Sequence, residues 1–269
     1  DWMLIFEKYK TSPEYQKINA GMSLLEFKKI FWLEYIHRLW GRIIGLAFVI
    51  PFICFVAFGW VNRRLTLSLL GLLILGGLQG GLGWYMVQSG LVDRPDVSQY
   101  RLAAHLALAL VIIAALFWTA RGLNRSCRKN WEFLDANSVI GLRRSAYGVL
   151  FAVFLTAVSG AFVAGLDAGL AYNTFPLMDG NWVPEGLLTM TPPFINFFEN
   201  TITVQFDHRV LALSTAALVI AVWVAALRHN IPPSARFAIN CLFLAVIAQV
   251  ALGITTLLLV VPIEWAAAH

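Results

Sequence analysis

The sequence contains few charged residues for its length. Only 13% of its 269 residues are Asp, Glu, Lys or Arg, whereas 59% are hydrophobic, and the mean hydropathy is +0.71. Because soluble domains carry about a quarter charged residues, this composition excludes a soluble protein. Six stretches without a charged residue reach the roughly 17 to 25 residues that a membrane-spanning helix needs: 43–62, 65–92, 102–120, 145–166, 210–227 and 237–263.

These stretches predict transmembrane helices. In lipid every backbone polar group must be paired within the chain, which leaves helices and closed barrels. The stretches lack the alternation of apolar and polar residues that barrel strands show. We therefore predict an all-α, polytopic helical bundle, in contact with membrane lipid, with six complete transmembrane helices.

Cysteine is scarce as well. The three cysteines, Cys54, Cys127 and Cys241, have no CxxC spacing, and two of them fall inside predicted helices. This pattern argues against a disulfide framework or a zinc site.

Lys and Arg are distributed unevenly between the predicted loops. The loops after the first, third and fifth helices contain Arg or Lys in excess, whereas 167–207 has acidic residues and no Lys or Arg. Short positive loops face the inner side of a membrane, so 93–101, 167–207 and the N-terminal segment are expected outside. The net charge of +5 then reports topology and calls for no nucleic-acid partner.

Four histidines fall near the predicted outer side and are related in pairs by a repeat. The pentapeptide 34–38 (EYIHR) is echoed by 205–209 (QFDHR), and 79–83 (QGGLG) by 249–253 (QVALG), at nearly equal intervals. His105 and His269 continue the series. The fifth, His229, falls on the inner side, where an interfacial loop residue is the simplest interpretation.

The repeat unit is four helices long, so we predict two parallel halves related by an axis along the membrane normal. The N-terminal half is 1–122 and the C-terminal half is 123–269. The fourth helix here has no partner in the first half, and His269 has no helix after it. We therefore expect a further helix before Asp1 and another after His269, eight in the intact protein.

The histidine spacing favours a flat ligand. Glu34, His37, Gly41 and Gly45 share one helix face, and glycines beneath a histidine leave room for a planar group. Ser23 to Glu26 reads as a capping box that starts this helix before the membrane.

Haem fits these features better than zinc. Neutral imidazoles from two facing helices bind haem iron axially, and Arg38, Arg101 and Arg209 are placed to pair with its propionates. Zinc is disfavoured because Glu34 is the only carboxylate at ligand-like spacing near the membrane. For a single His-Arg pair, interfacial anchoring is the alternative.

Several motifs, in this order and spacing, resemble those of the haem A synthase family, and its mitochondrial and proteobacterial branch most. They are 34–38 (EYIHR), 40–42 (WGR), 79–87 (QGGLGWYMV), 101–106 (RLAAHL), 159–169 (SGAFVAGLDAG) and 205–209 (QFDHR). The outer-loop cysteine pair of the Gram-positive branch is absent.

The resemblance implies oxidation of a ring methyl of haem O to a formyl group, giving haem A for cytochrome c oxidase. It implies a bacterial or mitochondrial inner-membrane protein with its haem sites on the outer side. Haem O synthase and an electron donor are the implied partners, and a homo-oligomer is compatible with it.

The resemblance also implies roles for single residues. His37 and His105, with Arg38 and Arg101, would bind the substrate haem in the first half. His208 and His269, with Arg209, would hold a haem b that relays electrons in the second half. These assignments make the four histidines the iron ligands.

Glu34 would transfer or position a proton at the reacting methyl. Its alternative is a surface carboxylate that pairs with Arg38 four residues later. Gln205 occupies the equivalent position in the second half and cannot exchange a proton, which favours chemistry in the first half.

Two other functions fit part of the pattern. A dihaem b-type cytochrome would pass electrons to or from quinone without modifying either haem. A transporter would use the repeat for alternating access, but the helices lack the mid-membrane acids and bases of such proteins. The apolar segment 186–198, interrupted by Pro192-Pro193, is either an interfacial cover over the second haem site or ordinary loop packing.

Overall fold

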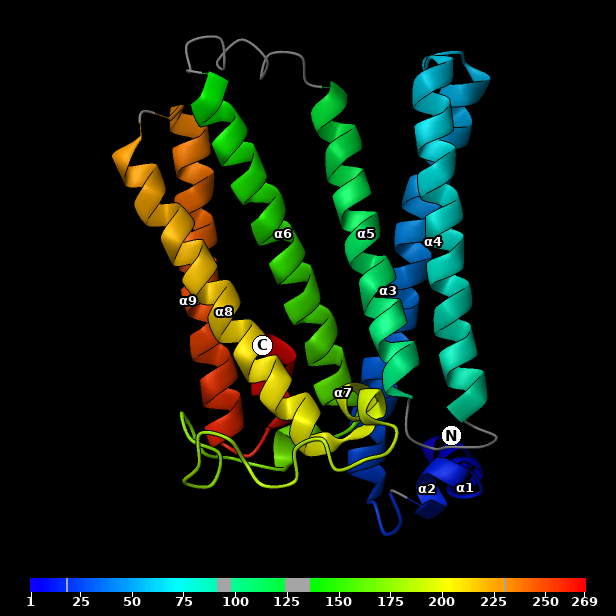
Figure 1. Ribbon diagram of the computed structural model, residues 1–269. Helices are drawn as coiled ribbons and strands as arrows, with labels where there is room; N and C mark the ends of the chain where they lie inside the picture. The colour runs from blue at the N-terminus through cyan, green and yellow to red at the C-terminus, as the bar shows by residue number, and fades with distance from the viewer. Residues whose placement is uncertain (18, 91–97, 124–135, 230) are drawn as a thin grey trace. The chain divides into compact units, whose positions relative to one another are not determined.

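The computed structural model describes residues 1–17, 19–90, 98–123, 136–229 and 231–269. Six long helices in these ranges are apolar enough to cross a membrane (Figure 1). They are α3 (Leu24–Ala57), α4 (Arg63–Gly90), α5 (Gln99–Leu123), α6 (Ala136–Gly165), α8 (Thr201–Arg228) and α9 (Pro233–Leu258). The prediction of an all-helical protein with six transmembrane helices is confirmed. Cys127 and parts of the predicted loops after α4 and α5 lie outside the described residues.

The first long helix begins well before its charge-free stretch, at the predicted capping box. The Ser23 hydroxyl accepts a hydrogen bond from the Glu26 amide at 3.3 Å, and the Glu26 carboxylate accepts one from the Ser23 amide at 2.8 Å. These bonds satisfy backbone groups that have no partner inside the helix. The predicted box is confirmed, and α3 carries Glu34 and His37 on one continuous helix.

Contacts divide the chain into two units. The first contains Asp1–Arg101 and Leu108–Leu123, and the second contains Leu102–Ala107 with the described residues of Asn124–His269. The assignment of 1–122 to a substrate haem and 123–269 to haem b stays a prediction.

In the first unit, an aromatic cluster attaches two short helices to the start of α3. These are α1 (Trp2–Lys10) and α2 (Pro13–Lys17). Phe6 and Phe27 are about 95% buried, with ring centroids 5.2 Å apart, and the Tyr9 ring lies 4.8 Å from Phe27. Buried aromatic pairs stabilise a fold by burial and by their offset or edge-on geometry, so this cluster fixes the N-terminal segment to α3.

In the second unit, α8 packs against both α6 and α9. Its buried residues are Thr203, Val204, Gln205, Thr215, Ala216, Val219 and Ala226. The hydroxyls of Thr156 on α6 and Thr215 on α8 lie 2.7 Å apart and are hydrogen-bonded. Small side chains and interhelical hydroxyl bonds let helix backbones approach closely in a membrane, which holds α6 and α8 in register.

The loop between α6 and α8 contains η2 (Ala168–Leu170), η3 (Pro193–Ile195) and α7 (Asn196–Glu199). Asn196 is fully buried; its amide donates to the carbonyls of Met190 and Pro193 at 2.8 and 2.9 Å, and its oxygen accepts from the Met190 amide at 2.9 Å. The Asn200 side chain caps α8 and donates to the Asn196 oxygen at 3.0 Å. Segment 186–198 is therefore a loop held by the hydrogen bonds of Asn196 and Asn200, and its role as a cover over a haem stays a prediction.

The chain ends in α10 (Ile263–Ala268), which follows a turn after α9. Val260 and Val261, in the turn, have φ angles of 62° and 56°. The end of the chain thereby returns to the side of α8 and α9 (Figure 1), which brings His269 into the second unit.

Replacing Ser23 by Ala should weaken the start of α3 by about 1 kcal/mol, because the cap bond is lost. Hydrogen exchange should show the Glu26 amide exchanging about fivefold faster, since 1.4 kcal/mol corresponds to a factor of ten. Ser23→Thr keeps a capping hydroxyl and should exchange at nearly the original rate. An unchanged rate in Ser23→Ala would contradict the role of the cap.

Replacing Asn196 by Ala should loosen the loop before α8, because part-buried backbone groups of Met190 and Pro193 lose their partner. Each buried group left without a partner costs about 1–3 kcal/mol. Limited proteolysis should cut between residues 186 and 200 faster than in the parent protein. The Trp182→Ala variant, which changes a 74% exposed side chain of the same loop, should be cut at the rate of the parent protein.

Candidate functional site

His208 lies near the start of α8 with its ring against α6. Its Nδ1 atom is 2.8 Å from the Ser159 hydroxyl. A β-carbon on Gly160 would lie 3.1 Å from the His208 Cε1 atom, closer than ordinary van der Waals contact. The glycine thus leaves the space on α6 into which the imidazole fits.

His269 follows α10 and rests against α9 in a similar way. A β-carbon on Gly253 would lie only 2.7 Å from its Cε1 atom. The Gln249 amide nitrogen is 3.3 Å from Nδ1 and also donates to the His269 carbonyl. Although much of the residue is accessible, desolvation of the ring against α9 lowers the pKa of His269. The imidazole is therefore neutral at neutral pH, the form that binds a metal.

The second unit brings these two predicted histidines together. A charge on His269 acts electrostatically on His208, and each ring lies against a glycine, Gly160 for His208 and Gly253 for His269. Two imidazoles presented by different segments suit the axial positions of a haem, whose flat ring fits between helices. The residues present therefore fit the predicted haem b.

Arg209 has partners that the sequence did not indicate. Its Nη1 and Nη2 atoms donate at 2.8 Å to the carbonyls of Thr174 and Tyr172, and the Gln205 amide donates to the same Tyr172 carbonyl at 3.0 Å. Within the described part of the chain, the Nε atom is buried without a hydrogen-bond partner. Arg209 thus fastens the loop after α6 to α8, and its predicted pairing with a propionate stays untested.

The equivalent arginine of the first unit has a different partner. The Arg38 guanidinium donates to the Glu34 carboxylate at 2.5 Å, and both side chains are about half exposed (50% and 53%). The pairing given above as the alternative for Glu34 is therefore present. The second unit has Gln205 where the first has Glu34, so Arg209 lacks an anion at that position and turns to backbone carbonyls.

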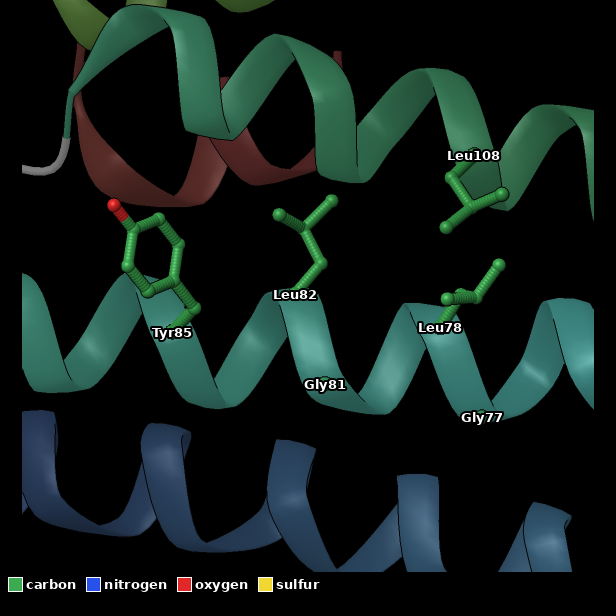
Figure 2. Close-up of a pocket in the computed structure, with 6 residues that line it drawn as sticks. All are labelled: Gly77, Leu78, Gly81, Leu82, Tyr85 and Leu108. Atoms are coloured by element: carbon green, nitrogen blue, oxygen red, sulfur yellow. The ribbon is translucent and has the colours of Figure 1, made fainter.

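The first unit also contains an apolar cavity of about 490 Å³ between α4 and α5. Figure 2 shows Leu78, Leu82 and Tyr85 pointing from α4 toward α5, and Leu108 pointing back. Gly77 and Gly81 complete the lining, and a β-carbon at either would meet no atom within 4 Å. The spacing of these glycines on one face could have indicated this cavity from the sequence.

Arg101 of α5 lies at one end of this cavity. Its guanidinium carbon is 4.9 Å from the centre of the Tyr85 ring, a cation–π distance. Tyr85 lines the cavity, so the first unit places a predicted haem-binding arginine beside an apolar space that is wide open to its surroundings.

His37 belongs to the first unit and His105 to the second. Their pairing around a substrate haem stays a prediction, as does the role of Glu34. Four residues that contact His208 or His269 have no role predicted from the sequence. Ser159 and Gly160 belong to the motif 159–169, and Gln249 and Gly253 belong to the repeat.

Comparison with known proteins gives one consistent result. The COX15-CtaA family model, described as "Cytochrome oxidase assembly protein", matches residues 1–269. A "Heme A synthase" from Nitrosospira multiformis is 53% identical over 270 residues, covering all of this chain and 75% of that protein. A "Heme A synthase" from Nitrosomonas eutropha is 48% identical, with the same coverage.

The similarity extends to mitochondrial proteins. A "Heme A synthase COX15" from Bos taurus is 46% identical over 275 residues, covering all of this chain and 66% of that protein. The resemblance inferred from the histidine motifs is confirmed over the full chain. The chain belongs to the haem A synthase family of cytochrome oxidase assembly proteins.

Proposed function

We propose that the protein oxidises the ring methyl of haem O to a formyl group, which yields haem A for cytochrome c oxidase. Family membership over the whole chain supports the reaction. The assignment of haem b to the second half is supported by one observation: the rings of His208 and His269 lie against glycines of neighbouring helices. Converting a methyl to a formyl group removes protons and electrons from the carbon and adds an oxygen atom. The protein must therefore accept protons and exchange electrons with a redox partner that, together with the oxygen source, balances the oxidation.

The second half, 123–269, holds haem b through His208 and His269. Gly160 and Gly253 leave room for the rings of both imidazoles. When bound, haem b would relay electrons between the reacting centre and a donor or acceptor outside the protein. Arg209 and Gln205 hold the loop at Tyr172 over the start of α8, which limits access of water to this end of the unit.

The first half, 1–122, binds the substrate haem through His37 and His105, with Arg38 and Arg101 toward its propionates. The glycine-lined cavity beside Tyr85 and the position of Arg101 support a flat, apolar ligand in this half. Arg38 pairs directly with the Oε2 atom of Glu34. A carboxylate beside the substrate can accept a proton from the reacting methyl group.

The distribution of Lys and Arg supports an orientation with the histidine ends of the helices on the periplasmic or intermembrane side. The family supports a bacterial or mitochondrial inner membrane. Haem O synthase, which would supply the substrate, and an electron donor are the proposed partners. A quinone-linked dihaem cytochrome and a transporter are less well supported, because the related proteins at about 50% identity are haem A synthases.

His208→Ala should remove the b-type haem from the full-length protein, because one axial ligand and the ring seated on Gly160 are lost. The reduced-minus-oxidised spectrum of purified protein should lose its haem b signal. His37→Ala should keep that signal and bind less haem O. His229→Ala, at the opposite end of α8, should change neither. Loss of haem b in His37→Ala but not in His208→Ala would reverse the division of labour.

Glu34→Gln should lower haem A formation by about 10²- to 10⁴-fold, the usual contribution of a general acid or base. The measurement is the ratio of haem A to haem O and its alcohol in pigment extracted after co-expression with a haem O source. Glu7→Gln, which breaks the exposed ion pair with Lys10, is the matched control.

Arg38→Gln separates the two interpretations of Glu34. If Glu34 acts only by pairing with Arg38, both variants should lower the haem A ratio equally. If Glu34 moves a proton, Arg38→Gln should retain more activity. Full haem A formation in Glu34→Gln would rule out a catalytic role.

A further inference from the structure

The hydroxyl of Ser159 lies between two groups of the second unit. Its oxygen is 2.8 Å from the Thr156 carbonyl oxygen and 2.8 Å from His208 Nδ1. A serine hydroxyl has one proton to donate and lone pairs to accept. A carbonyl can only accept, so the Ser159 proton points to Thr156.

The direction of this bond determines the proton on His208. With its own proton engaged, the Ser159 oxygen is left as an acceptor toward Nδ1, and Nδ1 must therefore carry hydrogen. A neutral imidazole has one ring proton, so Nε2 of His208 keeps its lone pair. Nε2 is thereby left as the nitrogen that can bind a metal.

Two further contacts make this arrangement rigid. Gly160, the next residue on α6, lies so close to the Cε1 edge of the ring that a β-carbon there would be 3.1 Å from it and would crowd the ring. One turn before Ser159, the Thr156 hydroxyl bonds to Thr215 of α8 at 2.7 Å and to the Ala152 carbonyl at 2.9 Å. The helix that carries Ser159 is thus tied to the helix that carries His208.

We propose that Ser159 is a positioning residue, which holds His208 as the Nδ1–H tautomer and leaves Nε2 for the iron of haem b. This inference rests on the proposed function for the identity of the metal group, and on the hydrogen bonds alone for the tautomer. His269 has a different neighbour, the Gln249 amide nitrogen at 3.3 Å, so the two imidazoles are oriented by unlike groups.

The first test measures the tautomer without haem. Full-length protein purified without haem and labelled with ¹⁵N-histidine should show His208 with its proton on Nδ1, assigned by the signal missing from His208→Gln. Ser159→Ala should shift the Nδ1–H to Nε2–H ratio by about tenfold toward Nε2–H, because the hydrogen bond that favours Nδ1–H is lost and its net free energy corresponds to a change of about this size. Ser159→Thr, which keeps the hydroxyl, should retain the original tautomer.

The second test uses the protein with haem bound. A hydrogen bond to the ring nitrogen that does not bind the metal orients a ligating histidine and makes the ligating nitrogen more basic. Loss of this hydrogen bond typically weakens metal binding about 10- to 100-fold. Ser159→Ala should lose haem b at least about tenfold faster to a haem acceptor protein. Its midpoint potential should rise, because a less basic imidazole stabilises ferric iron less.

Thr156→Val is the matched control, because it removes an interhelical hydroxyl bond but leaves the carbonyl that orients Ser159. It should keep the tautomer, the haem loss rate and the potential of the parent. Equal changes in Thr156→Val and Ser159→Ala would show that Ser159 acts only through helix packing, and this result would overturn the proposal. An Nε2–H tautomer in the parent protein would also overturn it. If the tautomer is Nδ1–H but His208→Ala keeps haem b, the proposed function fails while the positioning of His208 stands.

Discussion

The absence of a β-carbon at Gly160 and at Gly253 determines where the two histidine rings of the second half lie. Gly160 and Gly253 let the rings of His208 and His269 lie directly against the backbones of α6 and α9. Any larger residue at Gly253 would bring a carbon within 2.7 Å of the ring, a distance that real β-carbons do not tolerate. The close packing of α6 with α8, the hydroxyl bond between Thr156 and Thr215, and the return of the chain after α9 all serve this arrangement.

The two halves of the repeat differ beside their histidines. Both present a His-Arg pair within the first half of a long helix, but the residue one turn earlier differs. Glu34 pairs with Arg38 and supplies an ionisable oxygen, whereas Gln205 leaves Arg209 to bind the carbonyls of Tyr172 and Thr174. A change from carboxylate to amide thus replaces an ion pair with a loop anchor, and an amide, unlike a carboxylate, exchanges no proton.

The elements that could be predicted were those that depend on local composition. Charge-free stretches predicted the six helices because lipid admits few alternatives, and Ser23 with Glu26 predicted the start of α3 because a cap is formed by adjacent residues. The helices extend past the charge-free stretches, since charged residues such as Glu34 and Arg38 are tolerated near the membrane surface. Partners distant in sequence could not be predicted: nothing near Arg209 indicates that it binds residues 35 and 37 positions earlier.

The sequence by itself determined that this is a membrane protein, which residues repeat, and which family carries those motifs, because each depends on composition or on order along the chain. The tertiary structure alone decided that the Ser159 hydroxyl contacts Nδ1 of His208, that His269 lies against Gly253, and that α4 and α5 line an open apolar cavity. These depend on distances between helices, which packing sets and the order of residues does not reveal. The proposed position of the proton on His208 illustrates this dependence. It rests on the Ser159 hydroxyl, 49 residues away in the chain, and on the Thr156 carbonyl to which that hydroxyl donates.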